Sequence, residues 1–400
     1  MSTVPGNELL TEVEVPNRAG ARSGAVGKAI DTAIRSLVPV LLALVAGGVL
    51  LVILGHNPFA FYSSVWEHGA QGKAWQESAK RMAPLLLIAV GLIIAFRANI
   101  WNLGYNGQFL LSAAIISGLA PSLVNDLPLG LAFLVLFIVA GLVGAIWTIV
   151  PALLKAYYDT NEIITTLMMS FIGVGLAQIL IKGPFQDPSV NIAQTKVLAL
   201  SKMLPHIPGT KVHIGVLVAL AAAVVVYFAI SRTSFGLKID VLGANPRAAR
   251  HVGIQVRQLI ITSFFFSGLL IGLAAAADIL GVWGYIRANW NPSYGDTVIP
   301  FVFLARLNPL AVIPFIAFFA VLSTGGTLAT QEVGLPTDFL LVLVALILLF
   351  MTVIEFLGRR RSLGRSYLPN GLRAALRLPG GGKKDEPAAE PEEKPKEVAR

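Results

Sequence analysis

The chain has 400 residues, of which 55% are hydrophobic and only 13% are charged, against about 25% charged in an ordinary soluble domain. This composition excludes a soluble globular protein and predicts an integral membrane protein. The absence of cysteine excludes disulfides, thiolate metal sites and a cysteine nucleophile. The net charge of +9 is divided among loops beside apolar runs, so it favours a topological role and gives little support to nucleic-acid binding.

The two ends of the chain are polar. Residues 1–35 are predicted to form a cytoplasmic segment, and they lack the short apolar core and small-residue cleavage site of a signal peptide. Residues 36–358 are predicted to be the transmembrane domain. Residues 359–400 are predicted to be a cytoplasmic tail, disordered from about 380, where Pro, Glu and Lys dominate.

Apolar runs dominate the region between these ends. Seven of them are long enough, at about 20 residues per span, to cross a membrane as helices. Three shorter runs complete a set of about ten, and the absence of period-two alternation argues against an outer-membrane barrel. The predicted fold class is therefore all-α, a polytopic membrane helix bundle with some broken or short helices. The long runs lie near 37–54, 130–154, 163–181, 214–230, 259–280, 309–329 and 337–357, and the short ones near 82–96, 109–120 and 297–305.

Lys and Arg are unequally distributed over the predicted loops. With ten spans, Lys155 and the basic loop at 231–258 lie on the same face as both termini, whereas the opposite loops at 121–129 and 330–336 contain no Lys or Arg. Because positive charge accumulates on the cytoplasmic side, both termini are predicted to be cytoplasmic.

Residues 97–108 form a polar interruption between two of the short apolar runs, with three asparagines, a glutamine and two glycines. Such groups are costly next to lipid, so the segment is predicted to lie inside the protein, at a broken helix that lines a cavity. An ordinary cytoplasmic turn is the alternative. The candidate path or gating residues in this segment are Asn102, Asn106 and Gln108.

Asp278 is a carboxylate well inside an apolar run. Near the bilayer centre it would cost about 2.5–3.5 kcal/mol, so it is predicted to face the bundle interior or an aqueous boundary, either in the path or as a structural acceptor. The loop that follows mixes aromatic and amide side chains, which suits stacking on a sugar or base and equally suits an aromatic belt at the membrane interface. The candidate vestibule residues in this loop are Trp283, Tyr285, Trp290 and Tyr294.

The basic loop at 231–258 contains a helix start. Asn245 can cap the free amides of a helix, and the fixed φ of Pro246 suits its first position. Gly253 is placed to end this helix, so a compact basic helix of about two turns is predicted to project from the membrane and to dock on a partner. A solvated loop that only fixes topology is the alternative. The candidate docking residues are Gly243, Asn245, Pro246, Arg247, Arg250, His251 and Gly253.

Enzymatic motifs are incomplete in this sequence. Residues 24–29 resemble part of a phosphate-binding loop, but Arg22 stands where the first glycine should be and Ala29 where Ser or Thr should bind Mg²⁺. The five histidines are scattered without metal-ligand spacing, and no Gly-x-Ser-x-Gly elbow occurs. We therefore expect a transporter rather than an enzyme, without an ATPase motif or a cofactor of its own.

Three segments, in the same order, resemble the permease subunits of nucleoside and simple-sugar ATP-binding-cassette importers. Phe-Arg-Ala at 96–98, followed by Asn-Leu-Gly-Tyr-Asn-Gly-Gln at 102–108, is similar to that family's Phe-Arg-Ala-Gly-x-Phe-Asn-Ile-Gly-x-Glu-Gly-Gln signature. Asn-Glu-Ile-Ile-Thr-Thr-Leu-Met at 161–168 resembles its Asn-Glu-Val-Ile-x-Thr-x-Met segment. Residues 243–254 resemble its Gly-x-Asn-Pro-x-Ala-Ala-x-x-x-Gly-Ile coupling segment.

The resemblance implies a multi-pass subunit of a bacterial inner (cell) membrane, surrounded by lipid. Its partners would be a second permease in a heterodimer, ATP-binding subunits that use ATP–Mg, and an extracytoplasmic binding protein that delivers the solute. The helix from Pro246 would be the coupling helix that enters a groove of the ATP-binding subunit. The second motif adds Asn161, Glu162 and Thr165 to the candidate path residues.

The sequence also departs from the family pattern. Asn106 stands where relatives usually carry Glu, Asn99 and Trp101 replace Gly and Phe, and Asp278 stands where relatives tend to carry Glu. The long N-terminus and the loop at 55–83 resemble the longer permease of nucleoside systems, which favours nucleosides over simple sugars, with branched-chain amino acids third. The alternatives from other classes are an ion-coupled secondary transporter, with Asp278 as its ion site, and a passive channel.

Overall fold

The protein is described by a computed structural model that covers residues 21–362. Its described residues divide into two compact units: Val40–Leu348 form one, and residues 21–39 and 349–362 belong to the other. In the second unit, the described parts are the beginning of the first helix and the end of the last. The remainder of the predicted polar segment and the tail predicted to be disordered from about 380 lie outside the described residues.

Within residues 21–362 the chain is helical and contains no strand, apart from three isolated bridges in loops. The predicted all-α class is therefore confirmed. Residues 24–29, which resemble part of a phosphate-binding loop, are helical within α1. The helices are α1 (Ala21–Ile53), α2 (Pro58–Gly69), α3 (Trp75–Arg97), α4 (Tyr105–Asp126), α5 (Leu129–Trp147), α6 (Ile149–Tyr158), α7 (Glu162–Lys182), η2 (Leu200–Lys202), α8 (Gly215–Arg232), α9 (Ser234–Ala244), α10 (Pro246–His251), α11 (Val256–Asp278), η3 (Ile279–Trp283), α12 (Tyr294–Leu304), α13 (Val312–Glu332) and α14 (Phe339–Ser362).

Nine helices in the described part of the chain are long and apolar enough to cross a membrane. Two of them, α3 and α4, contain the runs that were expected to be short, and they reach 23 and 22 residues. In α3 the helix continues through polar residues, where Lys80 pairs with Glu77 at 2.8 Å, one turn away. Both helices are therefore candidate spans, as expected, and they are longer than their apolar runs because hydropathy marks only the apolar part of a helix.

The short apolar run near 297–305 corresponds to α12, which has only 11 residues. The segment that contains α12 begins at Gly284, whose carbonyl accepts from the Leu198 amide at 3.0 Å. Leu198 belongs to the long loop between α7 and α8. At the other end, the ring of Phe303 stacks on Phe96, at the end of α3, with centroids 5.3 Å apart. Residues 284–303 therefore connect the loop between α7 and α8 to the end of α3 through an extended stretch and a short helix. The described residues contain nine candidate spans, where the sequence predicts about ten.

Close contact between small residues holds the centre of the bundle together. A Cβ atom added to Gly144 of α5 would lie 2.2 Å from the carbonyl oxygen of Gly268 of α11, and one on Gly272 would lie 2.0 Å from that of Ala140. On another face of α11, a Cβ on Gly91 of α3 would lie 2.9 Å from the Ser267 carbonyl oxygen. The backbones thus touch directly, which is how membrane helices gain packing energy without a hydrophobic driving force between them.

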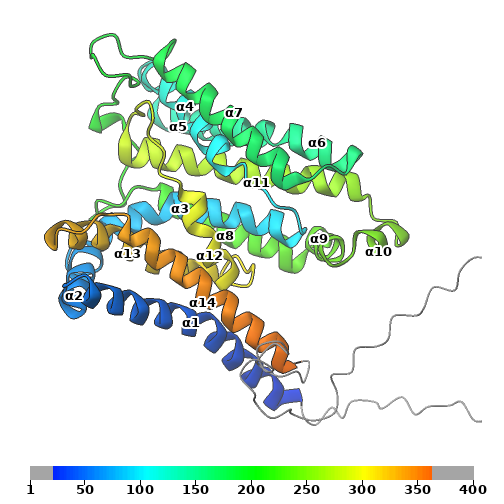
Figure 1. The fold of residues 1–400 in the computed structure, drawn as a ribbon. Helices are drawn as coiled ribbons and strands as arrows, with labels where there is room; N and C mark the ends of the chain where they lie inside the picture. Colours follow the sequence, from blue (N-terminus) through cyan, green and yellow to red (C-terminus); the bar gives the residue numbers. More distant parts are fainter. Residues whose placement is uncertain (1–20, 363–400) are drawn as a thin grey trace, which may run out of the picture. The chain divides into compact units, whose positions relative to one another are not determined.

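Helices α9 and α10 lie together at one end of the Val40–Leu348 unit, here called the α10 end, and the loop between α7 and α8 lies at the opposite end, the far end (Figure 1). The sequence predicts one short helix in 231–258, but the structure contains two. Arg97 holds α9 against α3 because its Nε and a terminal nitrogen donate to the two carboxylate oxygens of Asp240 at 2.9 and 3.0 Å. Gly243 allows the close approach, because a Cβ there would lie 2.1 Å from the Arg97 carbonyl oxygen.

His213 is fully buried at the far end. Its ring fills the space left by two glycines, since a Cβ on Gly215 or Gly281 would lie 2.6 Å from its Nδ1. Burial lowers the pKa of His213 from 6.5 to about 4, and the positive charges of Lys80 and His206 act in the same direction. The folded protein therefore holds this imidazole neutral at neutral pH.

Lowering the pH is expected to destabilise the protein through His213. Because its pKa is depressed in the folded state, the unfolded chain takes up the proton first, so the stabilisation is complete above about pH 6.5 and is lost as the pH falls toward 4. Between pH 7.5 and 5 the loss should be about 2 kcal/mol. Thermal unfolding in detergent at both pH values measures this loss of stability. The His213→Gln protein should lose less stability than the unmodified protein when the pH is lowered. Equal losses in the two proteins would contradict the assignment.

Candidate functional site

The short helix α10 begins where the sequence predicts. The side-chain oxygen of Asn245 accepts from the amides of Arg247 and Ala248 at 2.9 and 3.1 Å, and Pro246 takes the first helical position. The helix has six residues, somewhat less than the predicted two turns, and Gly253 follows it with φ +79°. Ala249 is buried and anchors the helix, while the other five residues are exposed. These five are Pro246, Arg247, Ala248, Arg250 and His251.

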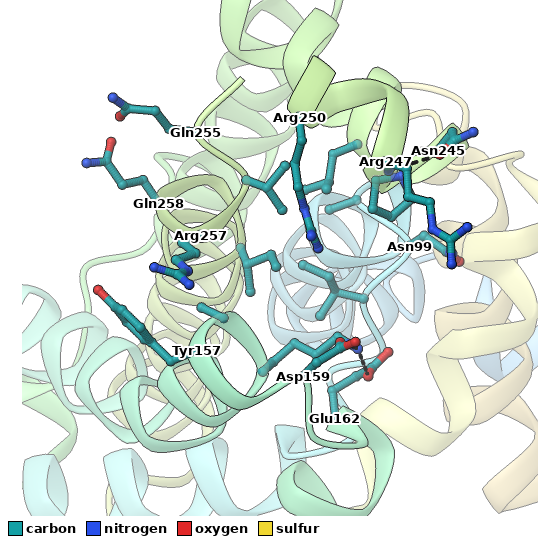
Figure 2. A pocket seen from close by; sticks show the side chains of 18 residues that line it. Asn99, Tyr157, Asp159, Glu162, Asn245, Arg247, Arg250, Gln255, Arg257 and Gln258 are labelled. Atoms are coloured by element: carbon teal, nitrogen blue, oxygen red, sulfur yellow. Dashed lines mark hydrogen bonds and ion pairs between the residues drawn. The ribbon is translucent and has the colours of Figure 1, made fainter. Parts of the chain in front are cut away.

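A pocket of about 1030 Å³ opens beside α10 (Figure 2). Arg250 points into this pocket from α10, whereas Gln255 and Gln258 point away from it. On the opposite wall, Arg257 lies over the ring of Tyr157, 5.1 Å from its centroid. The pocket is thus formed by α6, α10, the beginning of α11 and the chain that leaves α3 at 98–100.

Charges of both signs line the pocket. Lys155 Nζ pairs with Asp159 Oδ1 at 2.9 Å and with Glu162 Oε2 at 3.1 Å. The Lys155 ammonium holds the pKa of the Asp159 carboxyl below its usual range, and Arg250 acts more weakly in the same direction. Asp159 therefore remains ionised and largely exposed, opposite the basic side of α10.

Three candidate path residues lie at the start of α7, and one of them, Glu162, lines this pocket. Asn161 caps α7 by accepting from the Ile163 amide at 3.0 Å, and the Thr165 hydroxyl donates to the Asn161 carbonyl at 3.2 Å. Glu162 lines the pocket beside Lys155. The structure therefore places Asn161, Glu162 and Thr165 at the α10 end, at the start of α7.

The other polar candidates lie deeper in the bundle. Asn102 and Gln108 are buried and bonded to each other, with Gln108 Nε2 donating to Asn102 Oδ1 at 2.8 Å. Asn102 Nδ2 also donates to the Ser267 hydroxyl at 2.9 Å, and the Leu103 amide donates to the Thr166 hydroxyl at 3.1 Å. The extended chain between α3 and α4 thus has polar partners from α7 and α11 inside the protein.

Asp278 is the last residue of α11 and is 1% exposed. Its carboxylate oxygen Oδ2 is buried and has no hydrogen-bond partner among the described residues. After Asp278 the chain makes a π-helical turn and then leaves the helix at Gly284, with φ +70°. The carboxylate of Asp278 therefore faces the interior of the protein.

Three of the four vestibule candidates come together. The rings of Trp283 and Trp290 lie 5.5 Å apart edge-on, and Phe109 of α4 lies 5.5 Å from Tyr294 and 6.2 Å from Trp290. Tyr285 is separate from this group because it lies under the Arg287 guanidinium, 5.5 Å away.

Two acidic residues of these sites were missed from the sequence. Asp240 holds α9 against α3, and Asp296 accepts hydrogen bonds from the first turn of α4. The Phe-Arg-Ala motif drew attention to Arg97, but its partner is 143 residues away in the chain. The signal for Asp296 was its place at the end of the aromatic and amide loop, directly before an apolar run.

These features define a class: a polytopic membrane protein with an exposed, capped short helix at one end and polar residues in its interior, which is the architecture of a transporter permease. Residues 76–352 match the model of a family described as the branched-chain amino acid transport system permease component. The chain belongs to this family and is the permease component of an ATP-binding-cassette transporter. Membership in the family argues against the ion-coupled alternative.

The curated relatives are similar over most of their length. A glucose ABC transporter permease protein of Haloferax volcanii is 32% identical over 80% of this chain and 87% of its own. A guanosine ABC transporter permease protein of Bacillus subtilis is 29% identical over 79% and 91%, respectively. A nucleoside ABC transporter permease protein of Lactococcus lactis is 25% identical over 79% and 90%. No solved structure matches the chain.

Proposed function

We propose that this chain forms half of the translocation path of an importer for nucleosides or simple sugars, and that α10 is its coupling helix. The observation that carries the proposal is the exposed, Asn245-capped helix beside a pocket of mixed charge. An ATP-binding subunit would receive α10 and the rim of this pocket. The chain itself would have no ATPase motif and no cofactor, and its partner would use ATP–Mg.

The connections of α10 supply a route for coupling. It follows α9 directly, and α9 is fastened to the end of α3 by the Arg97–Asp240 pair and the close approach at Gly243. The chain leaving α3 leads within a few residues to Asn102 in the interior. A displacement of α10 would therefore move α9 and the end of α3 together, and so shift the start of α4 between two arrangements.

The substrate assignment rests on the relatives' printed activities. Two of the relatives named above carry guanosine or nucleosides and one carries glucose. The aromatic group of Trp283, Trp290 and Tyr294 suits solutes with a flat base or a sugar face. We place nucleosides first and simple sugars second. The system would lie in a bacterial inner membrane, with both termini cytoplasmic, and would contain a second, different permease and an extracytoplasmic binding protein.

Affinity purification of the detergent-solubilised chain from its native membrane tests the proposal. We expect an ATP-binding subunit and a second permease to co-purify, and the complex to import a nucleoside or sugar into liposomes only with ATP and a binding protein. A chain that purifies alone and moves solute under an ion gradient would overturn it. Recovery of two copies of this chain with the ATPase, and no second permease, would overturn the heterodimer.

A further inference from the structure

The carboxylate of Asp296, in α12, lies exposed next to the first turn of α4. Asp296, in the first turn of α12, accepts from the Tyr105 hydroxyl through Oδ1 at 2.5 Å and from Asn106 Nδ2 through Oδ2 at 3.1 Å. Its side chain is nevertheless exposed, while Tyr105 beneath it is buried. The first turns of α4 and α12 thus meet at a negative charge that remains accessible.

The depth of this charge follows from the neighbouring helix. The Gly107 amide of α4 donates to the Ser170 hydroxyl of α7 at 3.0 Å. Ser170 is eight residues beyond Glu162, so at 1.5 Å per residue this level lies about 12 Å inward from the α10 end of α7. An exposed carboxylate is costly in hydrocarbon at such a depth, and it therefore has to face water or a polar solute rather than lipid.

The charge is also uncompensated. Within residues 36–357, no Lys, Arg or His forms an ion pair with Asp296. A carboxylate has about four lone-pair positions, and its two neighbours use two of them. The free positions can accept hydrogen bonds from hydroxyl or N–H groups of a solute, whereas an anion would be repelled.

The aromatic group stands beside this carboxylate. Tyr294 is two residues before Asp296, in the same first turn of α12. Phe109, one turn after Asn106 on α4, contacts Tyr294 and Trp290. Trp283, at the edge of the group, is 40% exposed. Hydrogen-bond acceptors and flat apolar rings are therefore offered from the same two elements, α4 and α12 with its preceding loop.

From this arrangement we infer that Asp296 and Asn106 form an intramembrane binding subsite for neutral, donor-rich ring solutes, such as the ribose hydroxyls or base N–H groups of a nucleoside, and that the subsite rejects phosphorylated forms. The inference rests on the proposed function for the kind of solute and extends it by naming the residues that bind it. It assigns the selection against anions to the permease itself, in addition to any selection by a binding protein.

The natural absence of cysteine permits a direct test on the assembled complex. In the Asn106→Cys protein, the new thiol should react with a cationic methanethiosulfonate reagent about tenfold faster than with an anionic one, because Asp296 lies beside it. Adding Asp296→Asn should abolish this preference. Adenosine or ribose should slow the reaction, and adenosine monophosphate should not. Mass spectrometry of this chain measures all these rates.

Val225→Cys provides the matched control, since Val225 is an exposed apolar residue of α8 and should not react from within lipid. If position 106 is as unreactive as position 225, or shows no charge preference, the aqueous acidic subsite is overturned. If it reacts with the expected preference but adenosine monophosphate protects as well as adenosine, the rejection of anions is overturned. Failure of the proposed function is distinguishable, because a complex that imports neither nucleosides nor sugars would still reveal the accessibility and charge preference at position 106.

Discussion

Arg250→Glu is expected to abolish most ATP-driven uptake while leaving the protein folded in the membrane. Arg250 is exposed on α10 and points into the pocket, where Asp159 and Glu162 pair with Lys155 on the facing wall. Reversal places a third negative charge in this pocket and removes a positive one from the docking surface. Because reversing or truncating a charge at a close interface costs about 2–5 kcal/mol, uptake should fall by at least about tenfold.

The control for this prediction is Lys238→Glu, which makes the same charge change on α9. Lys238 is exposed at the same end of the bundle but does not line the pocket. Uptake and ATP hydrolysis by reconstituted complexes, together with the amount of each variant in the membrane, separate docking from folding. Normal uptake by Arg250→Glu, or equal losses in both variants, would contradict the assignment of α10 as the coupling helix.

Features that depend on neighbouring residues in the chain were predictable from the sequence. Spans follow from apolar runs, since each residue must be apolar where it meets lipid. The start of α10 follows from Asn245 and Pro246, because capping is a local interaction within three residues. The difference between the apolar run at 82–96 and the 23-residue helix α3 also has a local cause. The first two turns of α3 are polar, and a hydropathy window ends where the helix leaves the hydrocarbon.

Features that depend on distant residues were not predictable. Asp240 meets Arg97 only because α9 folds back on the end of α3, and Asp296 meets Asn106 only because α12 begins beside the first turn of α4. Asp296 lies 190 residues from Asn106, and one sequence contains nothing that relates such positions. Asn161, Glu162 and Thr165 are a different case. The sequence identified them as candidates, but it did not indicate that they lie at the α10 end of the bundle, where Glu162 lines the pocket.

Gly144→Leu is expected to prevent stable folding, whereas Gly130→Leu on the same helix should be tolerated. A side chain at 144 would meet the backbone of α11, with the Gly268 carbonyl oxygen 2.2 Å and the Gly272 amide nitrogen 2.9 Å from its Cβ. Backbone atoms cannot rotate away, so α5 and α11 would have to separate. Even the smaller Gly144→Ala change should cost about 1–3 kcal/mol.

Separation of α5 and α11 would also disturb the hydrogen bond between Asn102 and Ser267 in the interior. Ser267 precedes Gly268 and accepts the hydrogen bond from Asn102, so displacing α11 would leave a buried amide without that partner. At Gly130, by contrast, no atom lies within 4 Å of the added Cβ. The yield of protein from membranes and its apparent melting temperature in detergent measure both effects. Equal stability of the two leucine variants would mean that α5 and α11 do not touch through their backbones. Loss of stability in the Gly144→Leu protein alone would show that the contact of α5 with α11 at Gly144 is required for folding.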